Sequence, residues 1–374
     1  MGIVISEGKP SNKGGSAVNR GRWRSVGSAL SFRRIGAVYV LLVIIIIFSL
    51  WKPHLFATFT NVEVIIDQNA ITAIIALSLV AALSTGTFDL SVGSVMALAS
   101  VTIAWLIVEH GIGVPATLII TIAVTAAAGL VNAALVTVAN IDSFIGTLGT
   151  GAVFGAFNLY LSGDRSMSNP ELSNSFGRIA SAGLGGITVP VFVMLAIALT
   201  LWWVMEHTVT GRHLYATGFN EEAARLAGVA TRRLKFITLI VSALVAGVAG
   251  ILLTSQLGSS SPDIGPPYLL GAYAAAFLGA TQIRPGRFNP FGTVLAVLVI
   301  GTGTTGLTLV AAPVWTQSLF TGLALLLALW LSKFGRLRSK VDRSGRRFSS
   351  SGESASVADL PPAATKEIYE PNES

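Results

Sequence analysis

The sequence Leu234-Lys-Phe-Ile-Thr-Leu-Ile-Val-Ser-Ala-Leu-Val-Ala-Gly-Val-Ala-Gly-Ile-Leu-Leu-Thr-Ser255 decides the class of fold. After Lys235 it contains no charged side chain, and Ile, Leu, Val, Ala and Gly dominate it. An α-helix needs about 20 mainly apolar residues to cross the ~30 Å hydrocarbon core of a bilayer. The segment therefore predicts a transmembrane helix with basic residues at its start.

The composition indicates that lipid, rather than water, surrounds most of the chain. Of its 374 residues, 52% are hydrophobic and only 11% are charged. This is more apolar surface than one soluble core could bury. The sequence has no Cys, which excludes disulfides and Cys-ligated metals. Its four histidines (His54, His110, His207 and His213) form no helical pair at ligand spacing, so we expect no metal and no cofactor on this chain.

Ten apolar segments are candidates for membrane crossings. They lie near residues 36–55, 64–83, 92–109, 115–139, 144–162, 186–206, 234–255, 268–282, 292–311 and 315–332. We expect an all-α, polytopic membrane bundle of about ten transmembrane helices, several of them interrupted by Gly, Pro or an acid. The expected domain boundaries are an N-terminal tail at 1–35, a membrane domain at 36–332 and a C-terminal tail at 333–374. Both tails are rich in Gly, Ser and charge, which does not favour independent folding.

The positive charges predict the orientation of the chain. Of 25 Lys and Arg residues, seven lie in residues 1–35, five in 207–235, two in 284–287 and eight from 333 onward. The other three, Lys52, Arg165 and Arg178, fall in loops on the opposite side. Cytoplasmic loops retain positive charge. We therefore expect a multi-pass protein of the cell (inner) membrane, with both termini and the loop 207–235 on the cytoplasmic side.

The same placement of basic residues explains the net charge of +7, so the charge does not indicate a protein that binds nucleic acid. The basic residues lie beside helix ends, and no basic domain interleaved with aromatics is present.

Motifs for catalysis are also missing. The only Gly-Lys pair, Gly8-Lys9, is followed by Pro10 and cannot form a Gly-Lys-Ser/Thr phosphate loop. There is no His-Glu-x-x-His or Gly-x-Ser-x-Gly motif either, so the sequence favours a transporter or channel over an enzyme.

The loop 207–235 contains a complete short helix. Asn220 can cap its N-terminus, Glu221 and Glu222 place negative charge in the first turn, and Gly228 can end it in a left-handed conformation. Its body consists of Ala223, Ala224, Arg225, Leu226 and Ala227. A helix of about two turns is not stable alone in water. It either docks into a partner's groove or packs on its own bundle as a connector, and helix physics alone leaves both open.

Three further blocks place polar residues within apolar surroundings. The first, Gly86-Thr-Phe-Asp89-Leu-Ser91-Val-Gly93-Ser94, predicts a broken helix. Its Asp89 and Ser91 either cap the second half-helix or contact a solute. The second block comprises Asn132 and the run Asp142-Ser-Phe144-Ile-Gly-Thr147-Leu-Gly-Thr150. Its small residues favour close helix packing, whereas Phe144 could stack on a sugar ring. The third is Tyr268-Leu-Leu-Gly-Ala-Tyr-Ala-Ala-Ala-Phe-Leu-Gly-Ala-Thr281.

In order and spacing these blocks resemble motifs of ABC importer permeases of the ribose and simple-sugar branch. The segment Gly211-Arg-x-x-Tyr-Ala-x-Gly218, followed by Asn220–Gly228, is similar to the cytoplasmic coupling segment of that family. The chain departs from the family pattern at a few positions: Thr87 and Asp142 replace Gly and Pro, Leu269 and Gly271 stand where acids are common, and Arg284-Pro-Gly-Arg287 replaces a Gly-Gly loop.

The resemblance implies specific roles. Residues Asn220 to Gly228 would dock into a cleft of a separate ABC ATPase subunit, which would bind ATP and Mg. Asp89, Ser91, Asn132, Phe144 and Thr147 would contribute to the translocation pathway. A homodimer of this chain, with a soluble solute-binding protein, would import a sugar-like solute. The main alternative is an ion-coupled secondary transporter or channel for a small polar solute, for which Asp89 is the deep acid; a membrane-embedded enzyme is a third.

Overall fold

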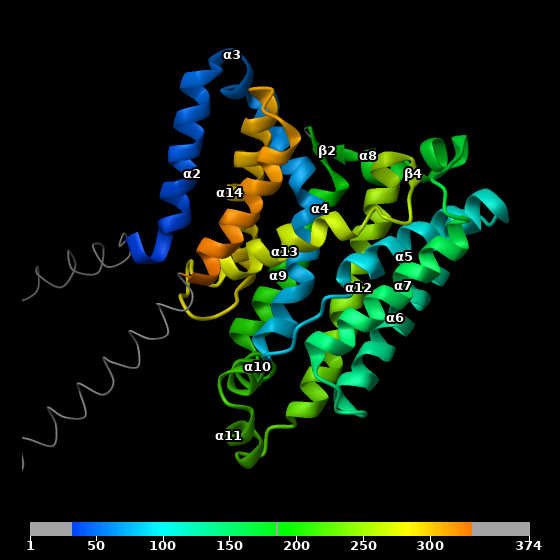
Figure 1. Cartoon of the computed structure of the whole chain (residues 1–374), viewed down its shortest axis with the longest axis vertical. Coiled ribbons are helices and arrows are strands. Elements are labelled where there is room, and N and C mark those ends of the chain that lie inside the picture. Colours follow the sequence, from blue (N-terminus) through cyan, green and yellow to red (C-terminus); the bar gives the residue numbers. More distant parts are fainter. Residues whose placement is uncertain (1–31, 185, 331–374) are drawn as a thin grey trace, which may run out of the picture.

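The structure is a computed structural model that describes residues 32–330 except residue 185. The predicted tails lie outside these residues, apart from positions 32–35, which begin the first described helix. The described part is almost entirely helical, as the sequence predicts (Figure 1).

The helices, in chain order, are α2 (Phe32–Trp51), α3 (Pro53–Phe56), α4 (Phe59–Ser84), α5 (Val92–Ala104), α6 (Val114–Thr137), α7 (Ser143–Ser162), α8 (Arg178–Ser181), α9 (Val189–His207), α10 (Val209–Phe219), α11 (Glu221–Leu226), α12 (Thr231–Leu257), α13 (Pro266–Gly279) and α14 (Pro290–Leu309). A last apolar helix covers Val314–Trp330. Two π-helical turns are η1 (Trp105–Glu109) and η2 (Leu172–Phe176). Four two-residue strands are β1 (Met167–Ser168), β2 (Gly183–Leu184), β3 (Ile187–Thr188) and β4 (Ser259–Ser260).

Each of the ten predicted segments contains a helix. Within the described residues, seven helices are long and apolar enough to cross a membrane: α4, α5 continued by η1, α6, α7, α9, α12 and α14. The prediction of a polytopic helical membrane protein is therefore confirmed. Ala37–Trp51 and Val314–Trp330 are shorter apolar helices. The predicted segment 268–282 forms α13, which has 14 residues. At 1.5 Å per residue it extends only about 21 Å, less than the hydrocarbon core.

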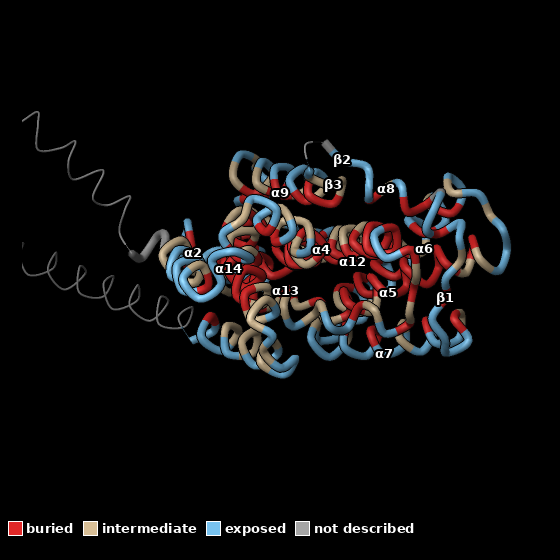
Figure 2. The backbone as a smooth tube through the Cα atoms, turned by 90° about the horizontal axis from the view of Figure 1, so that it is seen from above, coloured by how far each residue is buried: buried red, intermediate tan, exposed pale blue. Residues whose placement is uncertain are grey.

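The helices α4, α5 and α12 form the centre of the bundle. Every residue of α5 except Ser94 is buried, and α4 is buried over its C-terminal half. Around them α2, α6, α7 and α9 expose large apolar side chains, as expected of helices that face lipid (Figure 2). The all-round apolar character of α5 thus matches its central position.

Small residues allow the central helices to approach closely. A Cβ added at Gly250 of α12 would collide with the carbonyl of Met96 in α5. At the same interface the Thr254 hydroxyl donates to Ser100 Oγ over 2.7 Å, and Ser100 donates to Ser260 Oγ over 2.8 Å. Close backbone approach and interhelical hydrogen bonds are the usual means of joining helices in lipid.

The short strands form two antiparallel pairs at the end of the bundle opposite α11 (Figure 1). Strand β1 pairs with β4, and β2 pairs with β3 as a small hairpin. Asp67 of α4 accepts hydrogen bonds from the backbone and hydroxyl of Thr188 in β3. The hairpin is thereby attached to the start of the central helix α4.

Candidate translocation and coupling sites

The chain between α4 and α5 is the predicted broken helix. Helix α4 ends in a Schellman motif, in which the N–H of Thr87 donates to the carbonyl of Ala82 and the N–H of Gly86 donates to that of Leu83. Gly86 has φ of +79°, a value that glycine adopts without strain. The chain then leads from the lower end of α4 back towards the middle of the bundle, where α5 begins (Figure 1). The predicted break is confirmed.

Asp89 lies at the centre of this break, with none of its surface exposed. Its Oδ1 accepts hydrogen bonds from the backbone N–H of Ser91, over 3.1 Å, and from the Ser91 hydroxyl, over 2.6 Å. Its own backbone N–H donates to Tyr273 Oη of α13 over 3.1 Å. Asp89 therefore stabilises the turn that precedes α5, whereas Ser91 makes no side-chain hydrogen bond to the N-terminus of that helix.

The Ser91 hydroxyl instead links the break to two neighbouring helices. It accepts a hydrogen bond from Asn132 Nδ2 of α6 over 2.7 Å. Asn132 Oδ1 in turn accepts a hydrogen bond from the Thr150 hydroxyl of α7. Asp89, Ser91, Asn132 and Thr150 thus form a chain of side chains that are all buried. In low dielectric surroundings such a connected network is rigid and costly to disrupt.

Helix α7 holds the backbone of the break through hydroxyl groups on one face. Ser143 Oγ accepts from the N–H of Phe88 over 3.1 Å, and Thr147 Oγ1 accepts from the N–H of Leu90 over 3.0 Å. Phe144 meets Phe88 edge to face, with ring centroids 6.4 Å apart. Phe144 is 49% exposed, whereas Thr147 is fully buried. Of the five predicted pathway residues, only Phe144 is exposed.

The structure thus brings together all five predicted pathway residues: Asp89, Ser91, Asn132, Phe144 and Thr147. It adds Ser143, Thr150 and Tyr273. These residues lie within the polar blocks of the sequence but are not among the five predicted pathway residues. The spacing of Ser143 and Thr147, four residues apart on one helical face, is a sequence signal for their shared role. Tyr273 could not be linked to Asp89 from sequence, because 184 residues separate them.

The predicted short helix after Gly218 is also present. Helix α11 is capped by Asn220, whose side chain accepts from the N–H of Ala223 over 3.0 Å. It ends in a second Schellman motif, with Gly228 at φ +84° and hydrogen bonds from Gly228 to the Arg225 carbonyl and from Val229 to the Ala224 carbonyl. The predicted cap and the predicted stop are both confirmed.

Helix α11 projects from the bundle, and most of it is exposed. Leu226 is 80% exposed, and Phe219, just before the helix, is 65% exposed. Ala224, by contrast, is buried by its own chain, and its carbonyl accepts a hydrogen bond from the N–H of Val229.

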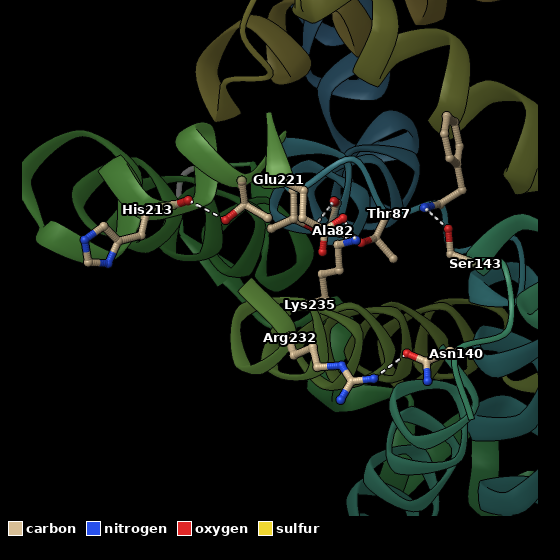
Figure 3. A network of polar contacts seen from close by, with 11 residues as sticks. Ala82, Thr87, Asn140, Ser143, His213, Glu221, Arg232 and Lys235 are labelled. Carbon is tan, nitrogen blue, oxygen red and sulfur yellow. Dashed lines mark hydrogen bonds and ion pairs between the residues drawn. The ribbon is translucent and has the colours of Figure 1, made fainter. Parts of the chain in front are cut away.

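Polar contacts join α11, α12 and the loop before α7 at this end of the bundle (Figure 3). Lys235 at the start of α12 pairs with Glu221 over 2.6 Å. Arg232, also of α12, donates to Asn140 in the loop between α6 and α7. Arg225 pairs with Glu222 within α11 itself. Of these contacts, the Lys235–Glu221 ion pair is the one that joins the projecting helix to α12.

Helix α10 lies between α11 and the break. The Tyr215 hydroxyl donates to the carbonyl of Phe288 over 2.9 Å, and Arg287 stacks over the rings of Tyr215 and Phe219. Burial, reinforced by the nearby Glu206, raises the pKa of Tyr215 to about 12, so its hydroxyl stays a donor at neutral pH. At the C-terminal end of α10, a Cβ on Gly218 would collide with the carbonyl of Ser84, the last residue of α4. Helix α10 therefore touches the end of α4, where the break begins.

These features describe a membrane protein with a polar break inside the bundle and a capped, exposed helix that projects from it. Residues 61–329 match the family described as branched-chain amino acid transport system / permease component, and the chain belongs to this family. It is 32% identical over 301 residues to a ribose import permease of Bacillus subtilis (strain 168), covering 80% of this chain and 93% of that protein.

Two other relatives carry different names. A D-allose transport system permease of Escherichia coli (strain K12) is 31% identical over 305 residues, covering 82% of this chain and 93% of the relative. An autoinducer 2 import system permease of Yersinia enterocolitica is 30% identical over 260 residues, covering 68% of this chain and 78% of the relative. No solved structure matches the chain. The resemblance inferred from the motifs is therefore confirmed.

Proposed function

We propose that this chain is the membrane-spanning permease subunit of an ABC importer for a sugar-like solute. The relatives named for ribose, D-allose and autoinducer 2 support this class of solute. The observation that carries the proposal is the surface of α11, a capped helix that projects from the bundle and exposes Leu226. An apolar side chain held out by a rigid helix suits a groove on a partner, here the separate ATPase that binds ATP and Mg.

The docking proposal is tested with Leu226→Glu. Because Leu226 is exposed, the charge should leave the bundle folded but prevent insertion into an apolar groove. We expect at least a tenfold loss of both ATPase copurification and solute uptake, which corresponds to about 1.4 kcal/mol. Leu257→Glu is the matched control, since Leu257 is also exposed but lies at the other end of α12.

Two outcomes would contradict the docking proposal. One is full uptake by well-expressed Leu226→Glu, and the other is an equal loss of ATPase binding in Leu257→Glu. Substitution of Ala224, by contrast, would disturb the chain's own packing and is a poor test.

The ion-coupled carrier is the alternative that the buried Asp89 favours. Uptake that persists in vesicles without the ATPase would support that alternative.

The orientation proposed for the chain places both termini and α10–α11 in the cytoplasm, as the distribution of Lys and Arg supports. The absence of Cys makes the natural sequence a ready background for labelling. Ala223→Cys should react with a membrane-impermeant thiol reagent only from the cytoplasmic side. Gln256→Cys, at the opposite end of α12, should react only from outside, where the solute-binding protein would deliver its cargo.

We further propose that two copies of the chain enclose the pathway. Phe144, the exposed member of the predicted pathway set, lies on α7 beside exposed Ile145 and Leu148. A second copy facing this side of α7 would cover these side chains and place Phe144 against a solute, where an aromatic face suits a sugar ring. Phe144→Cys should then form a disulfide between two copies in the membrane under oxidising conditions. Thr200→Cys, an exposed position on α9, is the control.

A further inference from the structure

Arg287 lies in the loop between α13 and α14 and joins this loop to α10. Its guanidinium carbon is 5.1 Å from the centre of the Tyr215 ring and 5.7 Å from the centre of the Phe219 ring. A guanidinium group within about 6 Å of an aromatic ring is attracted to the face of that ring. Phe219 directly precedes Asn220, the residue that caps α11. The loop is therefore attached to the helix that leads into α11.

The same loop is held to the helices on both sides of it by Asn289. The side-chain amide of Asn289 donates hydrogen bonds to the carbonyls of Gly279, over 3.1 Å, and Gln282, over 3.2 Å. Gly279 is the last residue of α13. The Asn289 Oδ1 atom accepts a hydrogen bond from the N–H of Gly292 over 2.7 Å and so caps α14. We therefore expect the loop to move together with α13 and α14.

A row of aromatic rings continues from this loop to the break. The ring of Phe288, which follows Arg287 in the chain, meets the Phe277 ring of α13 edge to face, with centroids 5.5 Å apart. One turn earlier in α13, the Tyr273 ring stacks on the Phe277 ring with centroids 6.3 Å apart. The Tyr273 hydroxyl accepts the backbone N–H of Asp89 over 3.1 Å. The contacts thus form a continuous line from α10 to the centre of the break.

We propose that Arg287, Phe277 and Tyr273 are positioning residues that transmit a movement of α10 and α11 to the break. Aromatic side chains suit this role, because they are large and have only two side-chain torsions. Closely packed side chains also transmit strain instead of absorbing it. The inference rests on the proposed function, because it takes the ATPase as the source of the movement.

A second contact between α10 and the break offers a different route. At Gly218, α10 touches the carbonyl of Ser84, the last residue of α4. This contact reaches only the start of the break, whereas the aromatic row reaches Asp89 at its centre. If the contact at Gly218 alone transmitted the movement, substitutions in α13 would leave the response of the break unchanged. The two routes can therefore be separated by experiment.

An environment-sensitive fluorophore in the break tests the role of the row, and the test does not depend on the solute. The natural sequence contains no Cys, so Phe88→Cys provides a single labelling site. Phe88 is half-buried, and its backbone N–H, which donates to Ser143, is kept in the variant. The labelled full-length chain is combined with the ATPase in lipid vesicles. Fluorescence is compared before and after the addition of ATP and vanadate, which hold the ATPase in one state.

We expect a fluorescence change in the labelled parent chain and a change at least about threefold smaller when Phe277→Leu is added, because leucine makes neither ring contact. Phe277→Tyr keeps the ring and should retain the change. Phe291→Leu is the matched control, since Phe291 of α14 is also half-buried and its ring lies 5.7 Å from that of Trp202, outside the row. ATPase copurification should stay within about twofold in all three variants, because these residues lie away from α11.

The two ends of the row should respond in the same way. Tyr273→Phe removes only the hydroxyl that accepts the Asp89 N–H, and Arg287→Met removes the guanidinium group that lies over the rings of α10. Each should reduce the fluorescence change by about threefold. Arg212→Met is the control for the loss of charge, because Arg212 is also exposed but lies at the start of α10.

A full fluorescence change in Phe277→Leu, or an equal reduction in Phe291→Leu, would overturn the aromatic row as the route. A parent chain whose break does not respond to ATP and vanadate would overturn it as well. The proposed function fails separately, if the ATPase does not copurify with the unmodified chain.

Discussion

Helix α4, which precedes the break, and the projecting helix α11 end in the same backbone motif. Their surroundings are opposite. Gly86 and Gly228 have φ values of +79° and +84°, and each is followed by the same pair of Schellman hydrogen bonds. Around Gly86 the polar groups are buried and most are paired with neighbouring helices. A Cβ at Gly228 would meet nothing within 4 Å.

This difference shows what a local motif does and does not determine. The Schellman motif sets the direction in which the chain leaves a helix. The sequence predicts a left-handed stop at Gly228 and a broken helix in the block that begins at Gly86. The surroundings decide whether the following residues hold the bundle together or remain free for a partner. Substitutions that are equal in chemistry should therefore have unequal consequences at the two sites.

The largest contrast is expected between Gly218→Ala and Gly228→Ala. At Gly218 the new methyl group would collide with the Ser84 carbonyl and push α10 away from the break, lowering the free energy of unfolding by about 2 kcal/mol or more. At Gly228 there is space for the methyl group. The free energy of unfolding should fall there by only about 1 kcal/mol, because alanine is strained in the left-handed conformation, and the effect should be confined to α11. Thermal unfolding of the purified variants in detergent measures both. Equal losses would show that α10 does not press on α4.

An intermediate effect is expected for Asn132→Leu. The substitution removes the amide that donates to Ser91 and accepts from Thr150, so it should lower the free energy of unfolding by about 1–3 kcal/mol. Thr137→Val on the same helix is the control, because the Thr137 hydroxyl bonds only to the carbonyl of Ala133 one turn away. That control should lose less than about 1 kcal/mol. If both variants were equally stable, the network at the break would contribute nothing beyond local helix bonds.

The smallest effect is expected for Glu221→Gln, which breaks the ion pair with Lys235. Glu221 is about half exposed, so solvent screens the pair and the free energy of unfolding should change by less than about 1 kcal/mol. The change should shrink further in high salt. ATPase binding and stability at low and high salt are the measurements. A large, salt-independent loss of stability would show that α11 is part of the folded bundle and not an appendage.

The sequence predicts the helices well, because the free energy of apolar side chains in lipid depends on composition more than on neighbours. The caps at Asn220 and Gly228 were also predictable, since each uses residues within one or two turns. The predicted segment 268–282 and helix α13 (Pro266–Gly279) differ by only two or three residues at each end, because the polar residues Thr281 and Gln282 follow soon after Gly279.

The sequence could predict which residues belong to the candidate pathway, but not which of their side chains contact one another. The sequence selects Asp89, Ser91 and Asn132 because polar residues are rare among apolar runs. Which side chain bonds to which depends on how α5, α6 and α12 pack, and 41 residues separate Ser91 from Asn132.

The burial of α5 has a consequence for how the protein is made. Ribosomes release α5 early, yet its partner helix α12 is synthesised much later, and Ser100 and Thr254 are 154 residues apart. Until α12 emerges, Ser100 lacks its partner Thr254. The packing of α12 against α5, where Gly250 meets Met96, is therefore a late step of assembly in the membrane. Substitutions at that contact should reduce the amount of mature protein, through degradation of incompletely assembled chains, before they affect the rate of transport per molecule.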